Sequence, residues 1–134
     1  MKVHPRAELI VAGARACVGT QFRVQGRLPS VGLDCVGVVV CAAAAAGIRL
    51  ADMADYSLRG EQARRLAAAL AGWRRVERGT AGDVLVVAPA VGARHVGVMT
   101  AGGLVHAHAG LRRVVEGPVD PDWRVIGLWR LPEE

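Results

Sequence analysis

The sequence predicts an α+β fold, with helices in its N-terminal half and an antiparallel β-sheet in its C-terminal half. Before residue 77, two segments carry apolar side chains at helical spacing, and between them lies a nearly continuous apolar run at residues 36–46. From Gly82 onward, short β-like segments alternate with turn residues. Helices followed by a strand meander are typical of an antiparallel sheet packed against a central helix.

The three expected helices have recognisable ends. Pro5 suits the first turn of the first helix, and Gly19 follows its last turn. The central helix is ambiguous by period, because valines favour strands, but an alanine block followed by Gly47 favours a helix. The third helix is amphipathic, with Arg74 and Arg75 on its expected solvent face. We therefore expect helices at residues 5–18, 36–46 and 61–76, joined by loops at 19–32 and 52–59.

The C-terminal half is expected to form five short strands. Pro89, Gly110 and the pair Gly117-Pro118 lie between the β-like segments and predict turns. No repeat, linker or second domain is evident, so we expect residues 1–134 to form one domain. The strands are expected at residues 83–88, 95–100, 104–108, 112–116 and 124–131.

Composition excludes several classes of partner. The chain is 52% hydrophobic and 22% charged, which is typical of a globular protein. Its net charge of +5 is spread along the chain, without the basic runs, zinc-finger spacing or Gly-rich phosphate loops of nucleic-acid-binding proteins. The apolar run at residues 36–48 would form a helix of about 20 Å, shorter than the roughly 30 Å core of a bilayer. We expect neither a nucleic-acid nor a membrane partner.

Cysteine usage and the N-terminus indicate where the chain is made. Cys17, Cys35 and Cys41 cannot all pair within one chain, and they lack zinc-ribbon spacing, so no disulfide framework is expected. Residues 1–5 are not followed by the apolar region and cleavage site of a signal peptide. We expect synthesis in the cytoplasm without such a signal.

Cys35 is the candidate nucleophile. Asp34 is a good N-cap residue, so Cys35 would be the first residue of the central helix. There, unpaired backbone N–H groups and the positive end of the helix dipole are expected to lower the pKa of the thiol and favour thiolate. The alternative is that Cys35 is a small buried core residue.

Three of the four histidines lie in one expected hairpin. A tight turn near residues 100–103 pairs Met99 with Leu104 and places His95, His106 and His108 on the same face of the sheet. A shift of two positions keeps that face but changes which histidine lies opposite His95. Geometry alone leaves His106 and His108 open as its partner.

A helix-borne cysteine beside a sheet-borne histidine is the arrangement of papain-like enzymes. One imidazole accepts the thiol proton and later protonates the leaving amine, while a second polar group orients it. Cys35, His95 and a second histidine also fit a zinc site, which would need Asp34 or Asp83 as a carboxylate base.

Six segments together carry a resemblance to a known family. They are Gly-Thr-Gln-Phe-Arg-Val-Gln-Gly-Arg at residues 19–27, Gly-Leu-Asp-Cys-Val-Gly at 32–37, Asp-Tyr-Ser at 55–57, Gly-Asp-Val-Leu at 82–85, His-Val-Gly-Val at 95–98 and Val-His-Ala at 105–107. These motifs resemble those of the NlpC-type cell-wall cysteine peptidases, and in particular the short tail peptidases of phages and gene-transfer agents.

The resemblance implies a role for each matching residue. Cys35 becomes the nucleophile, His95 the general base and His106 the residue that orients it, which leaves His108 as a bystander. Asp34 remains available as cap and as partner for a substrate amine. Phe22 stands where many members carry tyrosine, and Val36 replaces a frequent serine. Both departures fall at expected substrate-binding positions and affect specificity.

The resemblance further implies a peptidoglycan hydrolase that needs neither metal nor cofactor. Family members cleave peptide stems, often after γ-D-glutamyl residues. The expected partners are the stem peptide and other tail-tip or hub proteins, and the expected site of action is the periplasm of the target cell. The alternatives are a structural tail-tip protein with little hydrolase activity and an amidase on the same scaffold.

Overall fold

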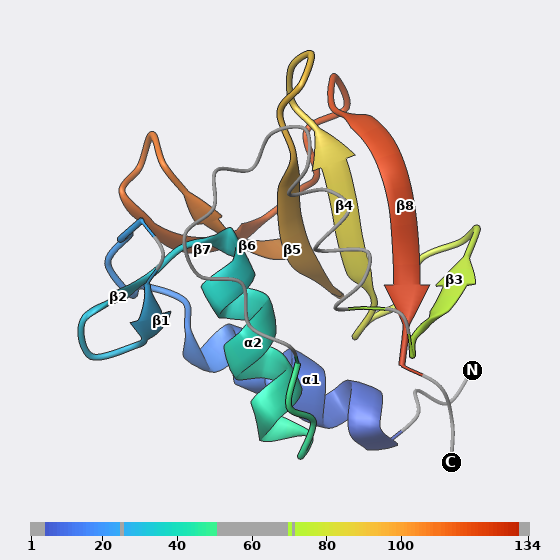
Figure 1. Cartoon of the computed structure of the whole chain (residues 1–134), viewed down its shortest axis with the longest axis horizontal. Helices are drawn as coiled ribbons and strands as arrows, with labels where there is room; N and C mark the ends of the chain where they lie inside the picture. The colour runs from blue at the N-terminus through green and yellow to red at the C-terminus, as the bar shows by residue number, and fades with distance from the viewer. Residues whose placement is uncertain (1–4, 25, 51–69, 71, 132–134) are drawn as a thin grey trace.

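The computed structural model describes residues 5–24, 26–50, 70 and 72–131. The described part contains two helices and eight strands, arranged as a small hairpin and a larger sheet (Figure 1). The elements are α1 (Pro5–Ala16), β1 (Arg27–Leu28), β2 (Gly32–Leu33), α2 (Cys35–Ala45), β3 (Arg74–Val76), β4 (Val84–Ala88), β5 (His95–Thr100), β6 (Gly103–His108), β7 (Arg113–Gly117) and β8 (Arg124–Arg130).

The larger sheet is antiparallel throughout and has the order β3-β8-β4-β5-β6-β7. Its five long strands match the expected ones to within one residue at each end. The predicted pairing of Met99 with Leu104 is confirmed. Helices before a meandering sheet make an α+β fold, as the sequence predicts. The positive φ of Gly47, +78°, also confirms the expected stop after the central helix.

The two helices cover one face of the sheet, and α2 lies directly against β5 and β6 (Figure 1). Alternate side chains of the strands point to this face, where Val96, Val98 and Val105 are fully buried with Val38 and Val39 of α2. The intervening side chains form a second, smaller cluster on the opposite face, composed of Leu85, Val87, Leu104 and Leu128 with Val76, Met99, Val119 and Trp123 at its margin.

Helices α1 and α2 approach very closely. A Cβ built on Gly13 of α1 would lie 2.5 Å from the Cβ of Ala45 and 3.1 Å from the Cα of Ala42. Only a residue without a side chain fits there. The close contact makes α1 the outer support of α2, the helix that begins at Cys35.

The prediction of a third helix is wrong for the last residues of its range, 74–76. Arg74, Arg75 and Val76 form β3, which pairs with Arg130, Trp129 and Leu128 of β8. Local sequence favoured a helix, but the backbone hydrogen bonds of these three residues are satisfied by a distant strand. Leu70 and Trp73 are buried, and Arg74 and Arg75 are exposed, as expected for them. Residues 61–69 and the loop at 52–59 lie outside the described residues.

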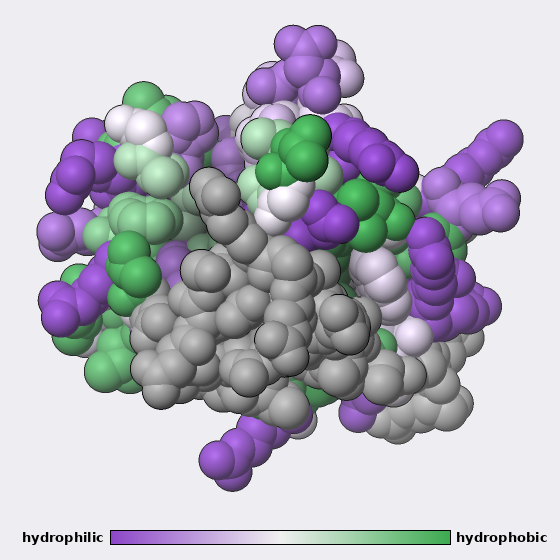
Figure 2. Space-filling model, turned by 45° about the horizontal axis from the view of Figure 1, so that its top comes forward, coloured by the Kyte–Doolittle hydropathy of each residue, from purple (hydrophilic) through white to green (hydrophobic). Residues whose placement is uncertain are grey.

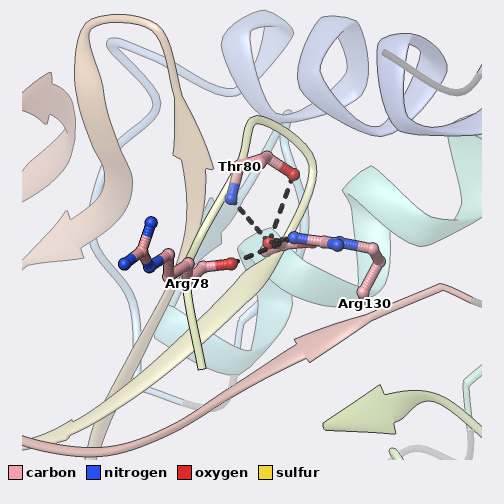
Figure 3. Close-up of polar contacts among 4 residues, drawn as sticks. Arg78, Thr80 and Arg130 are labelled. Carbon is pink, nitrogen blue, oxygen red and sulfur yellow. Dashed lines mark hydrogen bonds and ion pairs between the residues drawn. The ribbon is translucent and has the colours of Figure 1, made fainter. Parts of the chain in front are cut away.

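An ion pair between Asp83 and Arg130 links the start of β4 to the end of β8. Asp83 is 1% exposed and binds the Arg130 guanidinium through two hydrogen bonds of 2.9 Å. Figure 3 shows Arg130 also reaching towards Arg78, whose carbonyl accepts a hydrogen bond from it. The backbone N–H of Thr80 donates a further hydrogen bond of 2.7 Å to the Asp83 carboxylate. On the face shown in Figure 2, hydrophilic side chains protrude at the rim, among smaller apolar patches.

Candidate active site

Cys35 is the first residue of α2, as expected, and Asp34 is its N-cap. The Asp34 carboxylate accepts a hydrogen bond of 2.8 Å from the backbone N–H of Gly37. It also accepts one of 3.0 Å from the Arg27 guanidinium, which reaches across from β1. Asp34 therefore has two roles: it caps α2, and it neutralises the positive charge of Arg27.

The β5–β6 ladder opens at the point where α2 begins. The two strands pair from Val98 with Val105 up to the turn, so the ladder covers only the turn-proximal part of each strand. Beyond its last pair, the backbone N–H of Val96 lies near enough to the Cys35 thiol to lower its pKa. The thiol therefore lies beside the residue that follows His95.

His95 and His106 form a close pair. The Nε2 of His95 lies 2.7 Å from the Nδ1 of His106, within hydrogen-bond distance. In the tautomer in which His95 donates this hydrogen bond, its Nδ1 keeps a free lone pair. Trp123 packs against both rings, with centroids 5.3 Å from His95 and 5.6 Å from His106. The pair is therefore held in place by a hydrogen bond and by an aromatic wall.

His108 has a different environment. Its Nδ1 accepts a hydrogen bond of 3.0 Å from the backbone N–H of Leu111, and its ring centroid lies 5.8 Å from that of His106. All three imidazoles line one pocket, as the same-face prediction requires. Of the two histidines that the hairpin left open, His106 is the one that contacts the ring nitrogen of His95.

Cys35, His95 and His106 line a pocket of about 470 Å³. Two further predicted substrate-binding residues, Phe22 and Asp34, also lie on its wall. Val36 does not belong to the described lining: its side chain is 4% exposed and packs in the core beneath the pocket. The structure thus brings together every predicted site residue except Val36.

The electrostatics of Cys35 differ from the prediction. Burial and the neighbouring Asp34 charge raise the pKa of the Cys35 thiol to about 12. Backbone N–H groups of Val96, Val36 and Cys35 itself lower the pKa, but by less. The expected effect of the helix N-terminus is present, yet removal of water outweighs it. The resting sulfur is therefore a thiol.

The histidines are neutral at rest for a related reason. Burial lowers the pKa of His95 to about 4, with smaller contributions from His106 and His108. Burial and His108 likewise lower the pKa of His106 to about 4. A neutral imidazole beside a protonated thiol is an available base, so proton transfer must accompany nucleophilic attack instead of preceding it.

Trp123 and Arg94 stand out among the pocket residues that the sequence analysis missed. Trp123 is distant in sequence from the histidines, and no local pattern connects it with them. Arg94 lines the pocket and directly precedes His95, a position that could have drawn attention to it.

No group of three or more His, Cys, Asp or Glu side chains within the described ranges is placed to hold a metal ion. Asp83, which we considered as the base of a zinc site, lies at the other end of β4 from the strand position paired with His95, and it binds Arg130. No helix among the described residues is long and apolar enough to cross a membrane.

Solved structures with the same fold come from bacteria and a protist. NlpC1 of Trichomonas vaginalis aligns with a TM-score of 0.76 at 15% identity, over 100% of this chain and 47% of that one. The peptidoglycan hydrolase RipB of Mycobacterium tuberculosis aligns with a TM-score of 0.70 at 19% identity, over 96% and 66%. The chain spans about half the length of the first of these structures.

A third similar structure, RipD of M. tuberculosis, is described as a non-catalytic NlpC/p60 domain protein adapted to peptidoglycan binding. It aligns with a TM-score of 0.67 at 18% identity, over 97% of this chain and 100% of that one.

No curated protein sequence matches this chain. The model of the NlpC/P60 family matches residues 19–123, which is most of the chain. The chain therefore belongs to the NlpC/P60 family.

Proposed function

We propose that this protein is a cysteine endopeptidase that hydrolyses peptide stems of peptidoglycan. The observation that carries the proposal is the convergence of Cys35, His95 and His106 on one pocket, with the two imidazoles 2.7 Å apart. Membership of the NlpC/P60 family supports peptidoglycan as the substrate. His95 acts as the general base and His106 orients it.

The reaction follows from the neutral resting state of the site. As the Cys35 sulfur attacks the scissile carbonyl carbon, Nδ1 of His95 accepts the thiol proton, and the carbonyl oxygen becomes an oxyanion. Backbone N–H groups at the start of α2 stabilise this charge. His95 then gives the proton to the leaving amine, and the acyl group remains on sulfur. Water, deprotonated by His95, hydrolyses the thioester and restores the thiol.

The proposal also specifies which peptide bond is cut and where the protein acts. We propose a γ-D-glutamyl bond in the stem peptide and a place among the tail-tip or hub proteins of a phage-like particle. Synthesis in the cytoplasm, assembly into the tail and action in the periplasm of the target cell complete the proposal. The tail setting is supported by the resemblance of residues 19–27, 55–57 and 82–85 to the tail-peptidase branch.

The second candidate is a binding or structural protein with little or no hydrolase activity. Two observations favour it: RipD shares the fold and is non-catalytic, and the pKa of the Cys35 thiol is raised to about 12. An amidase would use the same three residues and differ only in the bond it cuts.

The test compares the intact protein with the Cys35→Ala variant on purified peptidoglycan, with released fragments identified by mass spectrometry. We expect stem-peptide fragments from the intact protein alone. Absence of fragments from both would favour the structural candidate, and equal release from both would exclude Cys35 as the nucleophile. Fragments cut between sugar and peptide would identify an amidase.

The orienting role is tested with two matched histidine variants. His106→Ala is expected to lower the hydrolysis rate by about two orders of magnitude or more, because His95 would lose the hydrogen bond that orients it as the general base. His108→Ala is expected to retain most of the rate. If only His108→Ala loses activity, the assignment of His106 is wrong.

A further inference from the structure

Arg94 carries an unsatisfied hydrogen-bond donor at the wall of the active-site pocket. It directly precedes β5 and lies next to His95 in the chain. Its Nε is buried and has no hydrogen-bond partner in the part of the chain that the structure describes. A buried donor without a partner costs free energy, so it indicates a group that arrives from outside.

One corner of the Arg94 guanidinium is engaged by the backbone. Nη1 of Arg94 donates a hydrogen bond of 2.8 Å to the carbonyl of Ala93, which fixes the plane of the group. The remaining edge consists of Nε and Nη2. In this same chain, Arg130 uses these two nitrogens to hold the Asp83 carboxylate, at 2.9 Å each. Arg94 thus presents the edge that suits a carboxylate.

The charge balance of the pocket also favours an anion. Among its described lining residues, Arg94 is the one guanidinium and Asp34 the one carboxylate. Asp34 is already engaged by Arg27 and by the backbone N–H of Gly37. Most of the other lining residues, including Phe22, Val24 and Trp123, are apolar or aromatic. An entering ammonium group would meet a neutralised carboxylate, whereas an entering carboxylate would meet a guanidinium whose Nε has no hydrogen-bond partner among the described residues.

We propose that Arg94 is a specificity-determining residue that binds a free carboxylate of the substrate beside the scissile bond. The identity of the peptide rests on the proposed function. A γ-linked D-glutamyl residue carries its α-carboxylate on the same residue as the scissile carbonyl, so one residue supplies both groups. The site would therefore distinguish stems with a free α-carboxylate from stems in which this group is amidated.

The test uses two synthetic stem peptides that differ only in carboxylate or amide at the D-glutamyl α-position. Binding is measured by calorimetry in the Cys35→Ala background, so that no turnover intervenes. We expect the carboxylate peptide to bind about tenfold to a hundredfold more tightly than the amide, the effect of one charge-assisted bidentate contact. Arg94→Gln is expected to abolish this preference, and Arg94→Lys to keep part of it.

A matched control is Arg74→Gln, which changes an exposed arginine of β3 that is not part of the pocket. It is expected to leave the preference unchanged, and thermal unfolding of each variant shows whether the fold is intact. Equal binding of the two peptides by the Cys35→Ala protein, or a preference that survives Arg94→Gln, overturns the inference, as does the failure of both peptides to bind.

Hydrolysis of the same peptides by the protein with Cys35 intact is scored separately. Carboxylate-selective binding without hydrolysis would overturn the peptidase proposal and leave the role of Arg94 standing. With hydrolysis, Arg94→Gln should raise KM for the carboxylate peptide about tenfold or more and change kcat little, because the contact forms in the bound ground state.

Discussion

Cys35 illustrates, at the scale of one residue, how competing effects set the chemistry of a side chain. Its place at a helix N-terminus favours thiolate, but burial and the Asp34 charge raise its pKa to about 12. Cys41 shows the opposite balance. The neighbouring Cys17 and the Arg27 charge lower the pKa of the Cys41 thiol, against the effect of burial. The candidate nucleophile is therefore the less reactive of these two thiols at rest.

This difference predicts an order of alkylation. With iodoacetamide, Cys41 should react faster than Cys35 at about pH 7, and the Cys35 rate should keep rising beyond about pH 9. Peptide mass spectrometry of samples quenched at several times measures both rates. Faster labelling of Cys35 than of Cys41 at neutral pH would contradict these pKa directions.

A second prediction at this scale concerns the pH dependence of hydrolysis. Since the pKa of His95 is lowered to about 4, kcat/KM should rise through about pH 4 and be flat up to neutrality. His106→Asn removes a nearby positive charge, so the His95 pKa and the acid limb should move to higher pH. Initial rates from pH 3 to about 8 test this. An acid limb that stays in place would exclude charge coupling between the two rings.

At the scale of elements, the contact between α1 and α2 determines how firmly the start of α2 is supported. Gly13 allows the two backbones to approach, because a Cβ there would lie 2.5 Å from Ala45. The contact joins atoms close to both backbones, so rotation of a long side chain cannot relieve it. The position of Cys35 thus depends on a glycine in another helix.

Gly13→Ala is therefore expected to destabilise the protein by about 1–3 kcal/mol despite the better helix propensity of alanine. Gly117→Ala is the matched control, since a Cβ at Gly117 would meet nothing within 4 Å. Denaturant unfolding of both variants measures the difference. Equal stability of the two would show that the helices can separate without cost.

The elements also show what the sequence could predict. The strands and the start of α2 followed from local signals: turn residues, alternation and the capping Asp34. The strand β3 did not, because Arg74, Arg75 and Val76 acquire their structure from pairing with β8. The pairing of His95 with His106 instead of His108 likewise depended on side-chain distances that no spacing fixes.

At the scale of the whole molecule, the buried histidines couple the active site to folding. The pKa of His95 is about 4 in the folded protein, below its ordinary value of 6.5, so the unfolded chain binds the proton more tightly. The contribution of this histidine to stability is fully present above about pH 6.5 and is lost as pH falls towards 4.

We expect the free energy of unfolding to fall by about 3 kcal/mol between pH 7 and pH 4 on account of His95. Denaturant titrations at several pH values measure it, and a His95→Gln variant should lose less stability over the same interval. An identical pH dependence in the variant would show that other groups cause the acid sensitivity.

The burial of the Cys35 thiol has a consequence for the lifetime of the protein. Removal of water and the Asp34 charge keep the sulfur of Cys35 protonated, and the residue is only 5% exposed. Peroxide attacks thiolate and accessible sulfur, so this cysteine is protected from oxidation to sulfenic and higher acids while it is idle.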